Sequence, residues 1–359
     1  MKKSLIAVAV AAALPTIALA QTNVTLYGIA DGGIGMQDRG GNAKSAIVVS
    51  SGTQSTSRFG IRGTEDLGGG MKATFNFESG IRADTGLGSP SNAGLDFSRR
   101  SVVGLEGSFG SVLLGRDYTP GFSAGGATDV MGYGLYGNYL GYTVVGALGL
   151  HGNPNHGIET RASNSIQYWT PNMGGLQIKA MWSFGERTAA PTRGGDLMGV
   201  SGVYSGGPLT LQAYYQQLKR LDVPGTGTTN NNQYGIGAGY NFGAFRLTAS
   251  YAVADPSGNA NKHSGFSVGA GVKVGVGEIL GQVIQQKIAT GASTEPKSTT
   301  IGVAYVHPLS RRTNVYATFG TTRNNAAGNF ALRASDETVA PLATGNDPKA
   351  FGVGVRHTF

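Results

Sequence analysis

The feature that most constrains this chain is an alternation of apolar and polar side chains with a period of two, from about residue 23 to the last residue. In Leu176–Phe184 (LQIKAMWSF) the first, third, fifth, seventh and ninth residues are apolar, and the second and fourth are Gln177 and Lys179. Successive side chains of a β-strand point to opposite faces. The alternation therefore predicts strands with one apolar and one polar face.

The faces of these strands favour a membrane barrel over a soluble β-sandwich, which would also alternate. The apolar faces often end in Tyr, Phe or Trp, as the aromatic girdle of a transmembrane barrel requires, and the polar faces carry small and charged residues that suit a water-filled lumen. The 60 glycines lie among β-branched and aromatic residues, which fits hairpins and curved strands. We predict an all-β fold, a 16-stranded antiparallel transmembrane β-barrel.

The connections between the predicted strands alternate between short and long, which is the asymmetry between periplasmic turns and external loops. Seven short turns and eight long loops place both termini at the periplasmic end. The short turns are Leu67–Gly70, Gly107–Gly110, Asn172–Gly175, Ser205–Pro208, Gly243, Gly275–Val276 and Leu309–Arg311. The predicted strands are 23–36, 56–66, 71–84, 95–106, 110–118, 160–171, 174–185, 195–205, 208–219, 231–242, 244–255, 263–274, 277–288, 297–308, 312–323 and 349–359.

The N-terminus has the pattern of an export signal. Lys2 and Lys3 are followed by the apolar run Leu5–Leu14 and by the small-x-small site Ala18–Ala20, so we expect cleavage before Gln21. No later segment approaches the ~20 apolar residues that a spanning helix needs. The chain has no cysteine, so a closed hydrogen-bonded barrel, rather than disulfides, would stabilise it. The predicted domains are a signal peptide, 1–20, and a transmembrane β-barrel, 21–359.

Charge and motifs exclude several classes of function. The formal net charge is +8, or +6 without Lys2 and Lys3, but no basic cluster on a helix indicates a nucleic-acid partner. Small anionic solutes and lipids are the expected partners. No nucleophile-elbow or phosphate-loop motif occurs, and His151 and His156 form a pair without a third ligand. We therefore predict no catalytic residue, no metal site and no cofactor, and a protein that is not an enzyme.

The segment between Asp117 and about Glu159 shows no steady alternation. A loop of this length without secondary structure is usually functional. It is either external decoration or a segment folded into the lumen. Its composition, rich in Gly, Tyr and Leu, favours the inward-folded alternative.

Seven stretches spread over the predicted barrel resemble the Gram-negative general diffusion porins of the betaproteobacterial and neisserial type. The resemblance implies a homotrimer in the outer membrane, in contact with its lipid and lipopolysaccharide, and an eyelet formed by the third loop. It also implies insertion by the outer-membrane assembly machinery, which reads an aromatic C-terminal residue, here Phe359. The stretches are Val24–Asp31, Ser57–Lys72, Arg99–Gly110, Leu114–Asp117, Tyr168–Asn172, Leu309–Thr313 and Gly354–Phe359.

Alternation shows which charged side chains can reach the lumen, where rings of charge select ions. Phe59 and Ile61 belong to an apolar face, so the neighbouring arginines of that strand point inward. The same argument turns the charged residues of two further strands toward the lumen. The inward-facing charged residues of these strands are Arg58, Arg62, Glu78, Arg82 and Arg161. Adjacent Arg99 and Arg100 should point to opposite sides, and alternation does not decide which of them faces the lumen.

The resemblance carries the eyelet arginines of anion-selective porins onto Arg58, Arg99 and Arg161, and the opposing acids onto Glu78 and Asp129. These five residues are the predicted pore constriction. An inward arginine on such a wall can also be ordinary solvated lumen surface. Further possible lumen charges are Arg62, Arg82, Arg116 and Lys179.

These features together predict a water-filled trimeric channel for passive diffusion of small hydrophilic solutes and ions, with a preference for anions. Two alternatives stay open. Stacked aromatic side chains along the lumen would favour a substrate-specific channel. The external loops could also serve an adhesin or a phage receptor.

Overall fold

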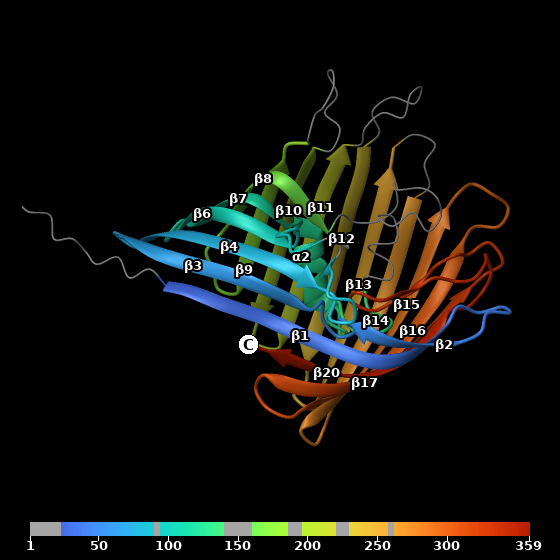
Figure 1. The fold of residues 1–359 in the computed structure, drawn as a ribbon. Helices are drawn as coiled ribbons and strands as arrows, with labels where there is room; N and C mark the ends of the chain where they lie inside the picture. Colours follow the sequence, from blue (N-terminus) through green and yellow to red (C-terminus); the bar gives the residue numbers. More distant parts are fainter. Residues whose placement is uncertain (1–22, 90–93, 140–159, 186–195, 220–229, 258–261) are drawn as a thin grey trace, which may run out of the picture.

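The structure is a computed structural model that describes residues 23–89, 94–139, 160–185, 196–219, 230–257 and 262–359. The predicted signal peptide, the end of the third loop and both His151 and His156 lie outside these residues. Sixteen long antiparallel strands form one closed wall, as predicted (Figure 1). The long strands are β1 (Asn23–Asp38), β3 (Arg58–Gly68), β4 (Met71–Ile81), β6 (Arg100–Gly107), β7 (Gly110–Tyr118), β8 (Arg161–Trp169), β9 (Leu176–Ser183), β10 (Leu197–Gly206), β11 (Leu209–Lys219), β12 (Asn230–Asn241), β13 (Phe245–Pro256), β14 (Lys262–Val274), β15 (Gly277–Ala289), β16 (Lys297–Pro308), β17 (Thr313–Asn324) and β20 (Lys349–Thr358).

Each long strand pairs with its neighbour along the chain, and β1 pairs with both β3 and β20, which closes the ring. The seven predicted short turns connect the strands at one end of the barrel. Several predicted strand ends were wrong by a few residues. The strand predicted from residue 95 begins at Arg100, and the strand predicted to reach residue 84 ends at Ile81. Residues 82–99, between these two ends, form the loop that joins β4 to β6.

Four short strands were not predicted. β2 (Ala46–Ser51) extends the first loop along β1, and β5 (Gly88–Ser89) pairs with the end of β4. β18 (Leu332–Arg333) and β19 (Thr338–Val339) form a separate small hairpin in the last loop. These pairs are too short to show a period in the sequence.

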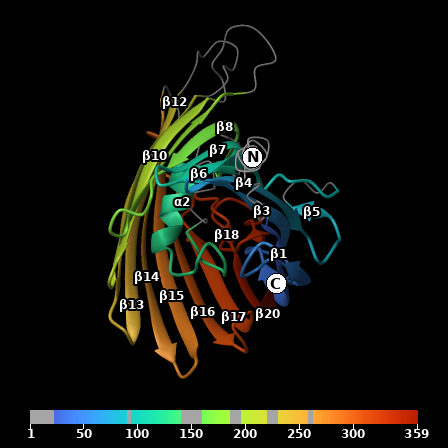
Figure 2. The ribbon, with the colours of Figure 1, turned by 90° about the vertical axis from the view of Figure 1, so that its left-hand side faces the viewer.

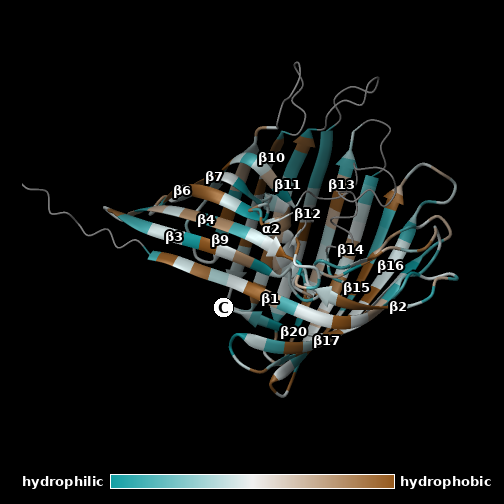
Figure 3. Ribbon diagram, in the orientation of Figure 1, coloured by the Kyte–Doolittle hydropathy of each residue, from teal (hydrophilic) through white to brown (hydrophobic). Residues whose placement is uncertain are grey.

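The outer face of the wall is apolar and the inner face is polar, so the predicted alternation is confirmed. Trp182 and Phe184 of the β9 region are 46% and 48% exposed, whereas Lys179 and Ser183 of the opposite face are buried. The apolar residues recur as separate bands along the strands in Figure 3. An apolar exterior of this kind matches the hydrocarbon core of a membrane.

The third loop folds into the barrel, as predicted. It begins with the short helix α2 (Pro120–Gly125), which Thr119 caps by accepting a hydrogen bond from the N–H of Phe122, and continues through η1 (Gly126–Thr128). Figure 2 shows α2 within the ring of strands. No helix in the described ranges is long and apolar enough to cross a membrane.

Polar side chains of the inner wall hold the third loop along its course. The amide of Gln216 in β11 accepts a hydrogen bond from the N–H of Gly121 (2.8 Å). The hydroxyls of Thr128 and Ser250 in β13 lie 2.7 Å apart, and farther along the N–H of Tyr136 donates to Thr318 in β17 (3.1 Å). The loop therefore runs from β11 across the interior to β17.

The loop between β17 and β20 also folds inward, which the sequence did not predict. Phe330, Leu332 and Ala334 of this loop are at most 1% exposed. Leu332 packs with Tyr136 of the third loop, and the N–H of Gly137 donates to the carbonyl of Arg333 (3.0 Å). Two loops thus fill part of the lumen and hold each other in place.

The seam between the first and last strands is closed by the terminal residue. Gly28 and Phe359 exchange two backbone hydrogen bonds, each 3.1 Å long. A Cβ on Gly28 would overlap the Phe359 ring and would lie 2.6 Å from the carbonyl oxygen of Arg58. Across the same seam, the hydroxyl of Tyr316 in β17 donates to Asp31 in β1 (2.7 Å).

We expect Gly28→Ala to destabilise the barrel by about 1–3 kcal/mol, the usual cost of overpacking. The added methyl group would be too close to the Phe359 ring and to the carbonyl oxygen of Arg58. Gly281→Ala is the matched control, since nothing lies within 4 Å of a Cβ at that strand position. The urea midpoint of refolded protein measures the effect. Equal midpoints for the two variants would show that the seam tolerates a side chain.

Candidate functional site: an arginine cluster in the lumen

Three arginines converge on one side of the lumen because each stands where a strand begins. Arg58 and Arg161 are the first residues of β3 and β8, and Arg99 immediately precedes β6. These strands belong to a continuous stretch of wall, and all three start at the end opposite the short turns. The geometry therefore brings together the three arginines that the resemblance assigned to the constriction.

Glu78 lies among these arginines rather than across from them. Its Oε1 accepts a hydrogen bond from Nε of Arg99 (2.8 Å) and is 3.8 Å from Nη1 of Arg58. The hydroxyl of Tyr27 lies 3.0 Å from its other oxygen. Glu78 therefore compensates one of the three positive charges of the cluster.

Tyr118 belongs to this site and was missed by the sequence prediction. Its hydroxyl oxygen accepts hydrogen bonds from Nη2 of Arg99 and Nη2 of Arg161, both 2.8 Å long. The Arg161 guanidinium also lies over the Tyr118 ring, 4.4 Å from its centroid, where a cation is attracted to the π-face. Tyr118 is the last residue of β7, directly before the third loop, and it lies one position beyond the stretch Leu114–Asp117 that carried the resemblance.

A column of aromatic rings supports Tyr118 on its other side. The ring of Phe122 stacks on Tyr118 with centroids 4.9 Å apart, and Tyr133 stacks on Phe122 at 4.4 Å. Tyr139 follows at 5.9 Å. Arg161 covers the free face of the Tyr118 ring, so the ring faces in this column are already in contact with other side chains. The column holds the arginine cluster against the third loop.

Asp129 lies apart from the arginine cluster. Its carboxylate accepts backbone hydrogen bonds from Met131 (3.2 Å), Tyr133 (2.7 Å) and Tyr139 (3.2 Å). Burial raises the pKa of this carboxyl, and the backbone donors oppose that shift. The side chain is 5% exposed, and these hydrogen bonds fix the shape of the third loop rather than joining Asp129 to the arginines.

The last loop brings a different acid to the arginines. Asp336 accepts hydrogen bonds from the hydroxyls of Thr56 (2.7 Å) and Ser89 (3.3 Å). Burial raises the pKa of Asp336, whereas these hydrogen bonds and the charges of Arg99 and Arg58 lower it. No strand alternation covers this loop, so the sequence carried no signal for its position.

The other predicted lumen charges occupy different surroundings. Lys179 faces inward but is 5% exposed, because its ammonium donates to the carbonyl of Tyr118 and to the Ser123 hydroxyl (3.2 Å). It therefore fixes the start of the third loop. Arg82 follows β4 and lies near Glu337, whose pKa is raised by burial against the effect of the arginine charge.

Arg116 and the pair Arg99–Arg100 show where alternation fails as a guide. Arg116 is the strand partner of Ser101, which alternates with the inward-facing residues of β6. The Arg116 side chain therefore points away from the lumen, and it donates to the carbonyl of Ser98 (2.5 Å). Arg100 faces inward and pairs with Asp117 (3.0 Å). Arg99 also reaches the lumen, since it precedes the strand and is not bound by its alternation.

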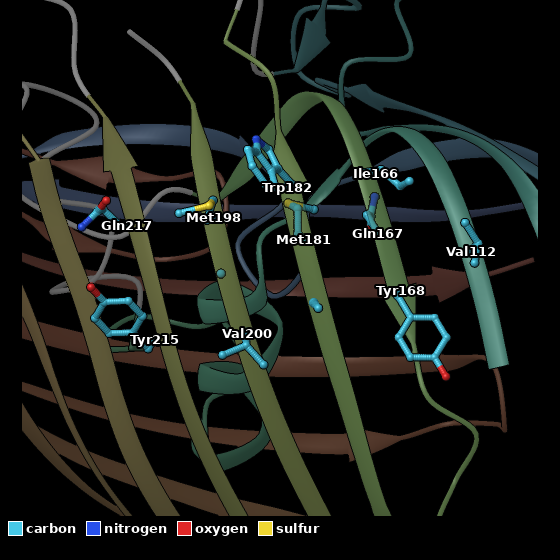
Figure 4. Close-up of a pocket in the computed structure, with 12 residues that line it drawn as sticks. Val112, Ile166, Gln167, Tyr168, Met181, Trp182, Met198, Val200, Tyr215 and Gln217 are labelled. Carbon is cyan, nitrogen blue, oxygen red and sulfur yellow. The ribbon is translucent and has the colours of Figure 1, made fainter. Parts of the chain in front are cut away.

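A large groove lies outside the lumen. It has a volume of about 700 Å³ and lies on the apolar outer face of β8 to β11 (Figure 4). Trp182, Met198, Val200 and Tyr215 line it, so it is part of the membrane-facing surface. Within the described residues, no group of three His, Cys, Asp or Glu side chains is placed to hold a metal ion.

Comparison with known proteins identifies the family. The family model described as "Gram-negative porin" matches residues 7–327. This chain belongs to the Gram-negative porin family. "Outer membrane porin protein 32" of Delftia acidovorans is 35% identical over the full length of both chains. The predictions of an outer-membrane location and of a channel rather than an enzyme are confirmed.

Two solved porins resemble this one in structure. The "anion-selective porin from Comamonas acidovorans" is 32% identical, with a TM-score of 0.80 over 94% of this chain and 100% of that one. The trimer form of OmpT from Vibrio cholerae is 18% identical, with a TM-score of 0.70 over 94% of this chain and 99% of that one. The second likeness bears on the fold alone.

The position of the acids predicts how selectivity responds to their removal. We expect Glu78→Gln to raise the chloride-to-potassium permeability ratio, by up to about fivefold, because it removes one negative charge worth ~1 kcal/mol at 4 Å in water. Glutamine keeps an acceptor for Arg99. Asp129→Asn is the control and should leave the ratio unchanged. Reversal potentials in a KCl gradient measure both, and an equal rise in the two variants would place Asp129 in the eyelet after all.

Proposed function

We propose that this porin is an anion-preferring diffusion channel whose constriction is formed by Arg58, Arg99 and Arg161 against the third loop. The observation that carries the proposal is their convergence around Tyr118 with one close carboxylate, Glu78. Three guanidinium groups against two carboxylates, Glu78 and Asp336, leave a local excess of one positive charge. The anion selectivity named for the structurally similar porin agrees with this proposal.

The physical basis is a fixed positive field in a narrow passage. Two unit charges at ~4–8 Å interact by roughly 2–4 kcal/mol at an effective dielectric constant near 20. The attraction of an anion to the cluster offsets part of the free energy that the anion loses by dehydration, whereas a cation is repelled. Salt screens this field over a Debye length of about 10 Å at 0.1 M, so the preference should be largest in dilute salt.

Replacing Arg58, Arg99 and Arg161 together with serine should abolish most of the preference for chloride over potassium and raise conductance, because three large cationic side chains leave the passage. The matched control replaces three exposed basic residues of a loop and a turn, Lys44, Arg311 and Arg312, with serine. Reversal potentials across a KCl gradient decide between them. A triple variant as anion-selective as the wild type would mean that the selectivity resides elsewhere.

We also propose that the porin is a homotrimer that associates through the part of the wall formed by β1, β2, β6 and β7. Apolar side chains are exposed there, including Ile47 (79%), Val49 (67%) and Leu26 (57%). Exposed apolar surface of this extent beside a membrane span can be covered by lipid or by another subunit. The trimer named for the OmpT structure is consistent with cover by another subunit.

An unheated sample on a denaturing gel should migrate as a trimer and a boiled sample as a monomer. Val49→Arg should shift the unheated band to the monomer, because it places a charge in the interface. Ile236→Arg carries the same change on the opposite part of the wall, where Ile236 is 64% exposed, and should leave the trimer intact. Monomers alone, before heating and after chemical crosslinking, would rule out the proposed assembly.

A further inference from the structure

We propose that the lumen contains a second binding station for small oxyanions, on the periplasmic side of the arginine cluster and centred on Arg62. The station is a polar pocket of about 240 Å³. That volume has room for about eight waters at ~30 Å³ each, and hence for a partly hydrated phosphate or carboxylate. The proposal rests on the proposed passage of anions and adds where they pause after the constriction.

The register of the strands places the pocket inside the barrel. Thr25 of β1 pairs with Arg62 of β3, Arg62 pairs with Asn76 of β4, and Asn76 pairs with Val102 of β6. Paired residues share a face. Asn76 also stands two residues from Glu78, which lies in the arginine cluster, so this row lies on the lumen side and one step closer to the short turns.

The lining has the donors that recognise an oxyanion. Arg62 is exposed, and its guanidinium carries five N–H donors in a planar fork. The side chains of Asn76, Thr25 and Thr74 add amide and hydroxyl groups around it. Arg100 contributes a second guanidinium, one nitrogen of which is 3.0 Å from Asp117.

The single carboxylate that lines the pocket, Glu106, lies at its far end. Glu106 lies six positions after Arg100 on β6, which is about 20 Å along a strand at ~3.3 Å per residue. Its strand partner is Lys72, another basic residue. The positive end of the pocket therefore faces the arginine cluster, and the acid lies at the periplasmic rim.

Tyr27 connects the two stations. Arg62 lies over the ring of Tyr27, 5.1 Å from its centroid. The Tyr27 hydroxyl is 2.9 Å from Oδ1 of Asn76 and 3.0 Å from Oε2 of Glu78. Glu78 in turn accepts from Arg99, so an anion leaving the constriction meets the next guanidinium without an intervening free acid. Sites in series allow a second ion to displace the first, which keeps flux high despite binding.

The test is block of chloride current by inorganic phosphate, added to one side at a time of channels inserted in one orientation. In wild-type porin, phosphate should block from both sides. In Arg62→Ser, block from the periplasmic side should need about 10-fold more phosphate, a change of 1.4 kcal/mol, and block from the extracellular side should be unchanged. Arg311→Ser removes the same charge from a periplasmic turn outside the pocket and should behave as wild type.

Asn76→Ala separates direct binding from general charge, because it removes an amide without altering the charge. It should weaken periplasmic block by phosphate, and succinate in place of phosphate tests whether carboxylates share the station. If Arg62→Ser and Arg311→Ser give the same block, or if Asn76→Ala has no effect, the station does not exist. Reversal potentials in a KCl gradient test the proposed constriction, whereas phosphate block tests the pocket. A wild-type porin without anion preference would therefore count against the constriction and not against the pocket.

Discussion

Every other feature of this porin depends on a wall whose backbone satisfies its own hydrogen bonds. Within hydrocarbon no water is available to an unpaired N–H or C=O group, so a spanning sheet must close on itself. The ring closes where β1 pairs with β20, and the last residue completes the pairing with Gly28. Once the ring is closed, alternation alone determines that each strand presents one face to the membrane and one to the lumen.

The polar inner face makes it possible for loops to enter the barrel. A loop without a hydrophobic core of its own needs partners for its backbone groups, and buried side chains such as Gln216, Thr318 and Gln282 supply them. Buried polar groups are costly unless they are paired. The third and last loops therefore gain stability from the wall, and they occupy part of the lumen without contributing to barrel closure.

The arginine cluster shows how a cationic site can be held nearly dry. Desolvating charges is expensive, and Arg99 is only 4% exposed. One carboxylate, one phenol oxygen and backbone carbonyls accept its hydrogen bonds and those of Arg161. Because these partners carry less negative charge than the three arginines carry positive charge, the cluster keeps a net positive charge while its geometry is fixed.

The family resemblance singled out Arg58, Arg99 and Arg161 for the proposed constriction, whereas the sequence by itself determined the sixteen strands, their faces and the seven turns. These follow from local patterns, since a period of two and short glycine-rich turns need no information about distant residues. Only the tertiary structure decided where the loops lie. Asp129 was expected opposite the arginines and shapes its own loop, whereas Asp336 reaches the cluster because the last loop folds into the lumen beside the strands that carry Tyr118 and the arginines. Such positions depend on packing across the barrel, for which the local sequence carries no period.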